Sequence, residues 1–130
     1  MSELNYLAIL VAAVAAVIVS TVYYSAFGSQ LAALNDAYAD QQRPPAWKVG
    51  VELLRCLVLA AVVASLAERT DTDGWTDALL LGLVLWIGFP VVLWTGAVVW
   101  ERVPRKLAAI HAGDWLIKLL VIASIVGLWR

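Results

Sequence analysis

Four long apolar stretches in the 130-residue chain limit its fold more than any other feature. Each approaches the roughly 20 residues that an α-helix needs to cross the hydrocarbon core of a bilayer. The stretches cover residues 4–27, 47–67, 75–99 and 107–129. Only helices and closed barrels satisfy their own backbone groups inside lipid. We therefore expect an all-α polytopic membrane protein, with four transmembrane helices in a bundle that forms one domain over residues 1–130.

The composition also indicates a membrane protein. Hydrophobic residues make up 63% of the chain and charged residues 15%, whereas soluble domains have roughly 45–50% and about 25%. The first stretch could be mistaken for a signal peptide. It lacks a basic leading region, however, and its apolar run exceeds the usual length of about 7–15 residues. We expect it to be retained as a helix.

Charge and cysteine content argue against several classes of function. A net charge of −1 provides no basic field that would attract nucleic acid. The single cysteine, Cys56, can form neither an intrachain disulfide nor a redox pair. The segment "DTDGWTD" begins like a calcium loop but lacks the bidentate glutamate, and Asp73 or Thr72 capping a helix explains it. We expect no metal site and no cofactor, and no motif makes a positive case for an enzyme.

The connection between the first two stretches contains a candidate short helix. Leu31, Leu34 and Tyr38 fall near one face at helical spacing, ahead of Pro44 and Pro45. This periodicity predicts a short interfacial helix between the first and second transmembrane helices. A solvated loop with a few apolar residues is the alternative.

The third stretch is interrupted by Pro90, just after Gly88. Proline lacks a backbone N–H and fixes φ, so we expect the helix to kink there. Two tryptophans of this stretch, Trp86 and Trp94, lie away from its ends, and we expect them to be packing residues.

The distribution of basic residues predicts the orientation of the chain. Five lysines or arginines fall on one side of the membrane and two, Arg69 and Arg130, on the other. The five are Arg43, Lys48, Arg102, Arg105 and Lys106. Because basic loops face the cytoplasm, we expect both termini to lie outside.

Two of the apolar stretches carry charged residues well inside the bilayer. Glu52 and Arg55 lie in the second stretch, Asp114 and Lys118 in the fourth, at comparable depths from the cytoplasmic side. A charge near the bilayer centre costs about 2.5–3.5 kcal/mol even on a lenient scale, so pairing is favoured. We expect Glu52 to pair with Lys118 and Arg55 with Asp114. Pairing within each helix, at i,i+3 and i,i+4, is the competing arrangement.

Other polar side chains gather at the same end of the predicted bundle, whereas the outer half has few. The candidate pocket or ion-pair cluster comprises Glu52, Arg55, Asp114, Lys118, His111, Tyr23, Tyr24 and Thr95. This asymmetry predicts a polar pocket that is open to the cytoplasm and closed toward the outside. In the alternative interpretation, the charges snorkel to the interface or act as packing glue that fixes the register of the helices.

Several motifs resemble one known family. "STVYYSAFG" at the end of the first stretch, "GLVLWIGF" in the third, and "ERVPRKLAAIHAGDWLIKLL" with the terminal "GLW" are similar to segments of the bacterial membrane family called domain of unknown function 1761. The matching positions are Tyr24, Ser25, Phe27, Gly28, Gly88, Phe89, His111, Gly113 and Trp115. Tyr23 stands where the family usually has tryptophan, and Asp114 stands where an aromatic residue is expected. The resemblance implies a small four-helix protein of the bacterial cytoplasmic membrane and assigns no activity.

The sequence supports two hypotheses about function, with a membrane enzyme as a third that no motif favours. The leading one is a transporter-like or ligand-binding bundle that uses the polar pocket for a small molecule or ion. The alternative is a structural or accessory subunit of a larger membrane complex, with the buried charges as packing glue. Four short helices enclose little volume, so we expect a homo-oligomer or a membrane-protein partner in the lipid bilayer, and no nucleic acid.

Overall fold

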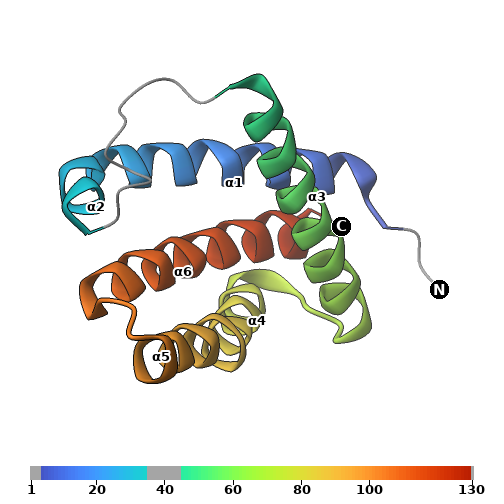
Figure 1. Ribbon diagram of the computed structural model, residues 1–130. Helices are drawn as coiled ribbons and strands as arrows, with labels where there is room; N and C mark the ends of the chain where they lie inside the picture. The colour runs from blue at the N-terminus through green and yellow to red at the C-terminus, as the bar shows by residue number, and fades with distance from the viewer. Residues whose placement is uncertain (1–3, 35–44, 130) are drawn as a thin grey trace.

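The computed structural model describes residues 4–34 and 45–129, and helices without strands make up this part of the chain (Figure 1). The helices are α1 (Tyr6–Ala26), α2 (Gly28–Leu34), α3 (Ala46–Arg69), α4 (Gly74–Gly88), α5 (Pro90–Glu101) and α6 (Arg105–Leu128). These helices form four spans that are long and apolar enough to cross a membrane: α1, α3, the α4–α5 pair and α6. The prediction of an all-α bundle with four membrane-spanning units is therefore confirmed.

Pro90 divides the third span into two helices, as its position predicts. The helix α4 ends at Gly88, and α5 begins at Pro90. Phe89, between them, has left the helical conformation with φ −122° and ψ −73°. A proline at the first position of a helix loses no hydrogen bond, because the N–H of that residue has no intrahelical partner. The two halves can therefore take different directions, and this frees α5 to line a different part of the bundle from α4.

The short helix predicted after the first span is present as α2. Its Leu31 is buried against Leu107 and Ile110 of α6, so α2 folds back onto the bundle. The predicted face also included Tyr38, and the helix was expected to end before Pro44; both residues lie outside the described part of the chain.

The span with the lowest mean hydropathy, α6, occupies the centre of the bundle. It packs against α1, α3, α4 and α5, and Figure 1 shows it running beside α1. Small side chains permit the close approach that drives helix association in lipid. Gly82 of α4 is one example, because a Cβ there would lie 3.1 Å from the carbonyl oxygen of Leu119 in α6.

The two ends of the bundle differ in chemistry. One end, which we call the basic end, carries Lys48, Arg102, Arg105 and Lys106 where α3 begins and where α5 leads into α6. The other, the terminal end, carries the start of α1 and the end of α6 (Figure 1). There Asn5 Oδ1 accepts from the N–H of Ala8, and Asn5 Nδ2 donates to the carbonyl of Trp129.

A compact apolar core fills the terminal half of the bundle. Its fully buried members are mostly small: Ala12, Ala13, Ala16, Ala60, Val63, Ala67, Ile122 and Ala123. Because small side chains bring the helix backbones close together, this half is closely packed. The basic half is hollowed instead, and it contains the candidate site.

Candidate functional site

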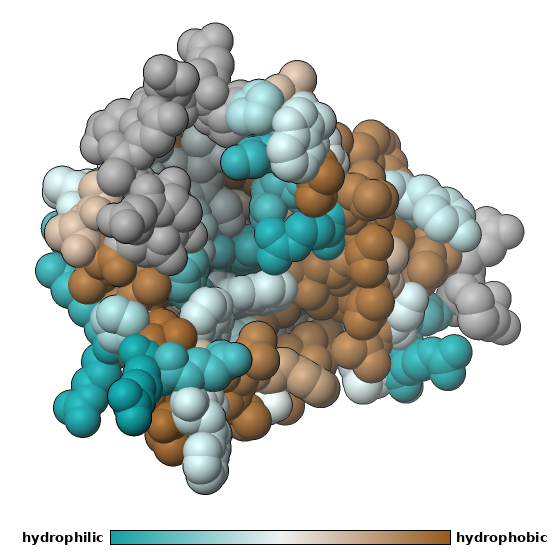
Figure 2. Space-filling view, viewed as in Figure 1, coloured by the Kyte–Doolittle hydropathy of each residue, from teal (hydrophilic) through white to brown (hydrophobic). Residues whose placement is uncertain are grey.

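A pocket of about 800 Å³ opens in the basic half of the bundle, between α1, α3, α5 and α6. Figure 2 shows polar side chains gathered around the hollow, next to the apolar surface of the spans. The lining residues that carry polar groups or aromatic rings are Ser20, Thr21, Tyr24, Ser25, Lys48, Glu52, Arg55, Trp94, His111, Asp114, Trp115 and Lys118. All four spans therefore contribute to one pocket.

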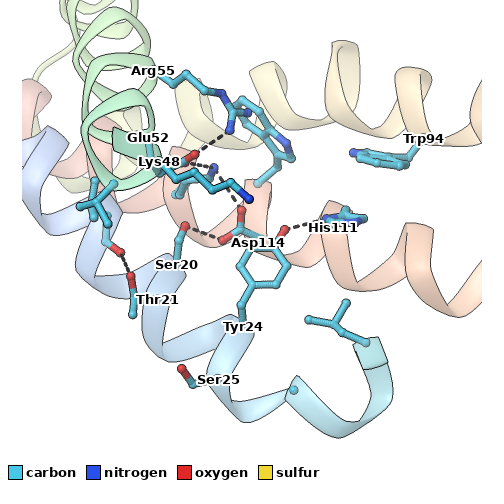
Figure 3. A pocket seen from close by; sticks show the side chains of 16 residues that line it. Ser20, Thr21, Tyr24, Ser25, Lys48, Glu52, Arg55, Trp94, His111 and Asp114 are labelled. Carbon is cyan, nitrogen blue, oxygen red and sulfur yellow. Dashed lines mark hydrogen bonds and ion pairs between the residues drawn. The ribbon is translucent and has the colours of Figure 1, made fainter. Parts of the chain in front are cut away.

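The floor of the pocket is an ion pair on α6. Lys118 Nζ lies 3.1 Å from Asp114 Oδ2, one helical turn away, and both residues are buried. Ser20 of α1 donates from its hydroxyl to the other carboxylate oxygen of Asp114 at 2.6 Å (Figure 3). Lys118 Nζ also lies 4.4 Å from the ring centroid of Trp115, a cation–π distance. These contacts anchor α6 to α1 through a charged group.

Glu52 of α3 joins this pair to the mouth of the pocket. Its Oε1 lies 3.9 Å from Lys118 Nζ, which confirms one of the two cross-helix pairs expected from the sequence. The expected pair of Arg55 with Asp114 is wrong: Arg55 Nη1 donates to Glu52 Oε2 at 2.6 Å. Both within-helix pairs, the competing arrangement, are thus formed. They win because partners one turn apart on a single helix can meet without help from helix packing.

Aromatic side chains form the wall toward α5. Tyr24 Oη is hydrogen-bonded to His111 Nδ1 at 2.7 Å, and the His111 ring stacks on Trp94 with centroids 4.6 Å apart and planes 12° apart. Trp94, expected only as a packing residue, therefore also lines the pocket. Pro90 gives α5 its own direction, and Trp94 lies one helical turn beyond it.

Lys48 is a lining residue that sequence reasoning assigned only to the orientation of the chain. In Figure 3 its side chain extends into the pocket from the first turn of α3. The described lining residues include three basic side chains, Lys48, Arg55 and Lys118, and two carboxylic acid side chains, Glu52 and Asp114. These five groups sum to a formal charge of +1, with His111 counted as neutral. The signal in the sequence was the spacing of Lys48, Glu52 and Arg55, which fall on nearby positions of one helix face.

Two residues of the predicted cluster lie outside the pocket. Thr95 is exposed, and its hydroxyl donates to the carbonyl of Val91 in its own helix. Tyr23 contacts α6 beside the pocket, where its hydroxyl donates to the carbonyl of Ile110 at 2.8 Å. The contact with α6 is so close that a Cβ at Gly113 would lie 2.3 Å from Tyr23 Oη. Tyr23 therefore joins α1 to α6 and does not line the pocket.

No group of three or more His, Cys, Asp or Glu side chains is arranged to hold a metal ion within residues 4–34 and 45–129. Cys56 is buried beside the pocket, with its Sγ 3.8 Å from Glu52 Oε1. The side chains that line the pocket offer ionic contact, hydrogen bonding and aromatic packing.

Comparison with known proteins agrees with the resemblance noted from the sequence motifs. The model of one family, described as "Protein of unknown function (DUF1761)", matches residues 7–127. No curated protein and no solved structure matches the chain. The matched region extends from the first turn of α1 to the last turn of α6 and contains every residue of the pocket. The chain therefore belongs to the DUF1761 family of proteins of unknown function.

Proposed function

We propose that this protein is a ligand-binding membrane bundle whose pocket opens to the cytoplasm. The observation that carries the proposal is the pocket itself, because about 800 Å³ of space is lined by five charged residues and several aromatic rings. This volume falls in the range of roughly 300–1,000 Å³ typical of small-molecule sites. Placing charged side chains around an open space within a membrane protein is costly, and intramembrane ionisable residues commonly mark functional sites.

The orientation follows from the distribution of basic residues. Lys48, Arg102, Arg105 and Lys106 lie at the basic end, and basic segments are retained in the cytoplasm. On this basis the pocket faces the cytoplasm, both termini lie outside, and the chain resides in the bacterial cytoplasmic membrane.

The packing supports binding more directly than passage through the membrane. The small-residue core around Ala16, Ala60 and Ile122 occupies the half of the bundle beyond the pocket. A ligand would therefore enter and leave on one side, and a transporter-like cycle would require a second conformation that opens this core. A homo-oligomer would supply another route at a subunit interface, and this stays a prediction.

The alternative is a structural or accessory subunit whose charges hold the helices together. Two contacts favour it: Ser20 with Asp114, and Lys118 with Glu52, each joining two helices. Such a role needs no solvent-accessible space among the charges. Access of water-soluble reagents to the pocket therefore separates the two functions.

The test is thiol accessibility in a Cys56→Ala background. Thr21→Cys places a thiol in the pocket lining. Val22→Cys places a thiol at the next position, which lies outside the lining and where the native side chain is 65% exposed. Sealed vesicles of both orientations are treated with a membrane-impermeant cationic methanethiosulfonate. We expect Thr21→Cys to react only when the basic end faces the reagent, and Val22→Cys to react from neither side.

Two results would contradict the proposal. If Thr21→Cys reacts from neither side while the protein stays folded by size-exclusion chromatography, the pocket admits no solute and the accessory function is favoured. If it reacts from both sides, the core of the terminal half is not closed and the protein is a pore.

A further inference from the structure

We infer that the pocket binds the negatively charged group of an amphipathic organic anion, an inference that rests on the proposed ligand-binding function. The charge of its described lining is the starting point. Lys48, Arg55 and Lys118 outnumber Glu52 and Asp114. One negative group on a ligand would neutralise the set.

The two carboxylates are already engaged by groups of this chain. Asp114 binds Lys118 and the hydroxyl of Ser20, while Glu52 binds Arg55 and lies within ion-pair distance of Lys118. A cationic ligand would have to displace these partners to reach a carboxylate. An anionic ligand would not, so the pocket discriminates by the sign of the charge.

The cations near the mouth retain capacity to bind. Among the described residues, no carboxylate lies within ion-pair distance of Lys48, whose Nζ is 5.7 Å from the ring centroid of Trp47. Arg55 uses Nη1 for Glu52, but a guanidinium has five N–H donors in a planar fork that suits carboxylate and phosphate groups. Its side chain is 59% exposed, so a second acceptor can approach.

The remaining walls suit the rest of such a ligand. Tyr24, Trp94 and Trp115 present aromatic rings, and Val17 and Val49 present aliphatic surface. A ligand with one carboxylate or phosphate and an apolar or flat body would meet both kinds of wall. Two sources have this chemistry: a soluble organic anion from the cytoplasm, and the headgroup of an anionic lipid.

The experiment compares two thiol reagents of opposite charge on the Thr21→Cys protein in the Cys56→Ala background. These are the anionic 2-sulfonatoethyl and the cationic 2-(trimethylammonium)ethyl methanethiosulfonates. The ratio of their rates is normalised to that of Ser29→Cys, an exposed position at the basic end outside the pocket lining. We expect the normalised anion-to-cation ratio to be at least about five-fold, because a nearby unit charge acts oppositely on the two reagents.

A matched pair of lysine variants assigns the effect to the pocket. Lys48→Gln should remove most of the preference for the anionic reagent. Lys106→Gln, which removes an exposed lysine at the same end but outside the lining, should leave it unchanged. Equal effects of the two variants would mean that the surface potential, and not the pocket, selects the anion, and would overturn the inference.

Protection experiments distinguish the two sources of the ligand. The reporter is the anionic reagent's rate at Thr21→Cys relative to Ser29→Cys, which corrects for the potential of the lipid surface. If this rate falls when phosphatidylglycerol replaces phosphatidylcholine, and the fall is absent in Lys48→Gln, the ligand is a lipid headgroup. If added benzoate or inorganic phosphate lowers this rate in phosphatidylcholine vesicles, and the effect is absent in Lys48→Gln, the ligand is a soluble anion.

Failure of this inference can be told from failure of the proposed function. If neither reagent labels Thr21→Cys, the pocket is closed and both fall. If both label it with the charge ratio found at Ser29→Cys and no anion protects it, the pocket is accessible but not selective, and only the anion inference is overturned.

Discussion

Lys118 Nζ lies 3.1 Å from Asp114 Oδ2, with 5% and 2% of the two side chains exposed. The two partners are not equivalent. Lys118 has a second carboxylate, Glu52, at 3.9 Å, whereas the other partner of Asp114 is the neutral hydroxyl of Ser20. Loss of one partner should therefore affect the fold more than loss of the other.

We predict that Lys118→Met lowers the free energy of unfolding by about 3–5 kcal/mol, because it leaves a buried carboxylate without its cation. Asp114→Asn should lower it less, since Glu52 still faces Lys118. The double variant should recover most of the loss, because two neutral groups replace the pair. Unfolding of the purified protein in detergent, with the oligomeric state followed in parallel, measures this. Lys106→Met, an exposed lysine of the same helix, is the control, and single variants as stable as the parent would contradict the prediction.

Gly113→Ala should destabilise the contact between α1 and α6. The added Cβ would lie 2.3 Å from Tyr23 Oη, so the Tyr23 side chain would have to move and lose its hydrogen bond to Ile110. We expect a loss of about 1–3 kcal/mol, as for other overpacked sites. Gly96→Ala, where a Cβ would meet nothing within 4 Å, should cause no loss.

A second substitution tests whether this clash is the cause. Tyr23→Phe removes the hydroxyl, and the nearest ring atom would then lie 3.3 Å from the new Cβ. In that background Gly113→Ala should therefore cost less stability than in the parent protein. Equal costs in the two backgrounds would show that the clash is elsewhere.

Tyr24→Phe should weaken the wall formed by His111 and Trp94. It removes the 2.7 Å hydrogen bond to His111 Nδ1 and should lower the free energy of unfolding by about 0.5–1.5 kcal/mol, the usual net value of such a bond. Tyr6→Phe, at a residue that is 75% exposed, should have no effect. A double-mutant cycle with His111→Phe isolates the pair, and a coupling energy near zero would contradict the assignment.

Glu52→Gln should change the pocket's charge in the direction opposite to Lys48→Gln. It removes one of the two carboxylates of the described lining and replaces the charged partner of Arg55 with a neutral amide. The anionic reagent should therefore label Thr21→Cys faster relative to the cationic one than in the parent. Glu101→Gln, an exposed glutamate at the basic end, should leave the ratio unchanged, and a fall in the ratio for Glu52→Gln would be inconsistent with an electrostatic origin.

The spans, the break at Pro90 and the short helix near Leu31 could be predicted from the sequence, because each depends on local composition or on a property of one residue. Length and hydropathy determine a span, and the missing N–H of proline interrupts a helix wherever it falls. The pair of Glu52 with Lys118 could also be predicted, because the sequence gives both the depth of each residue along its span and the sign of its charge.

The sides of α5 on which Trp94 and Thr95 lie relative to the pocket could not be predicted. These neighbours point about 100° apart on α5, and only Trp94 lines the pocket. In a soluble amphipathic helix the apolar stripe identifies the inner face. In a span that is apolar on all sides, lipid and protein interior both accept apolar side chains. The hydropathy pattern of α5 therefore does not identify which of its faces turns toward the bundle. Arg55 was misassigned for a related reason, because pairing by depth ignores which face of α3 each side chain occupies.

The pairing of charges within single helices also bears on how the chain enters the bilayer. Arg55 meets Glu52 on α3, and Lys118 meets Asp114 on α6, each within one turn. Each segment can therefore partition into lipid during synthesis with its own counter-charge in place, before any other helix arrives. Insertion of α3 does not have to wait for α6. The contacts between helices, Ser20 with Asp114 and Lys118 with Glu52, are then left to select the register in which helices that are already inserted assemble.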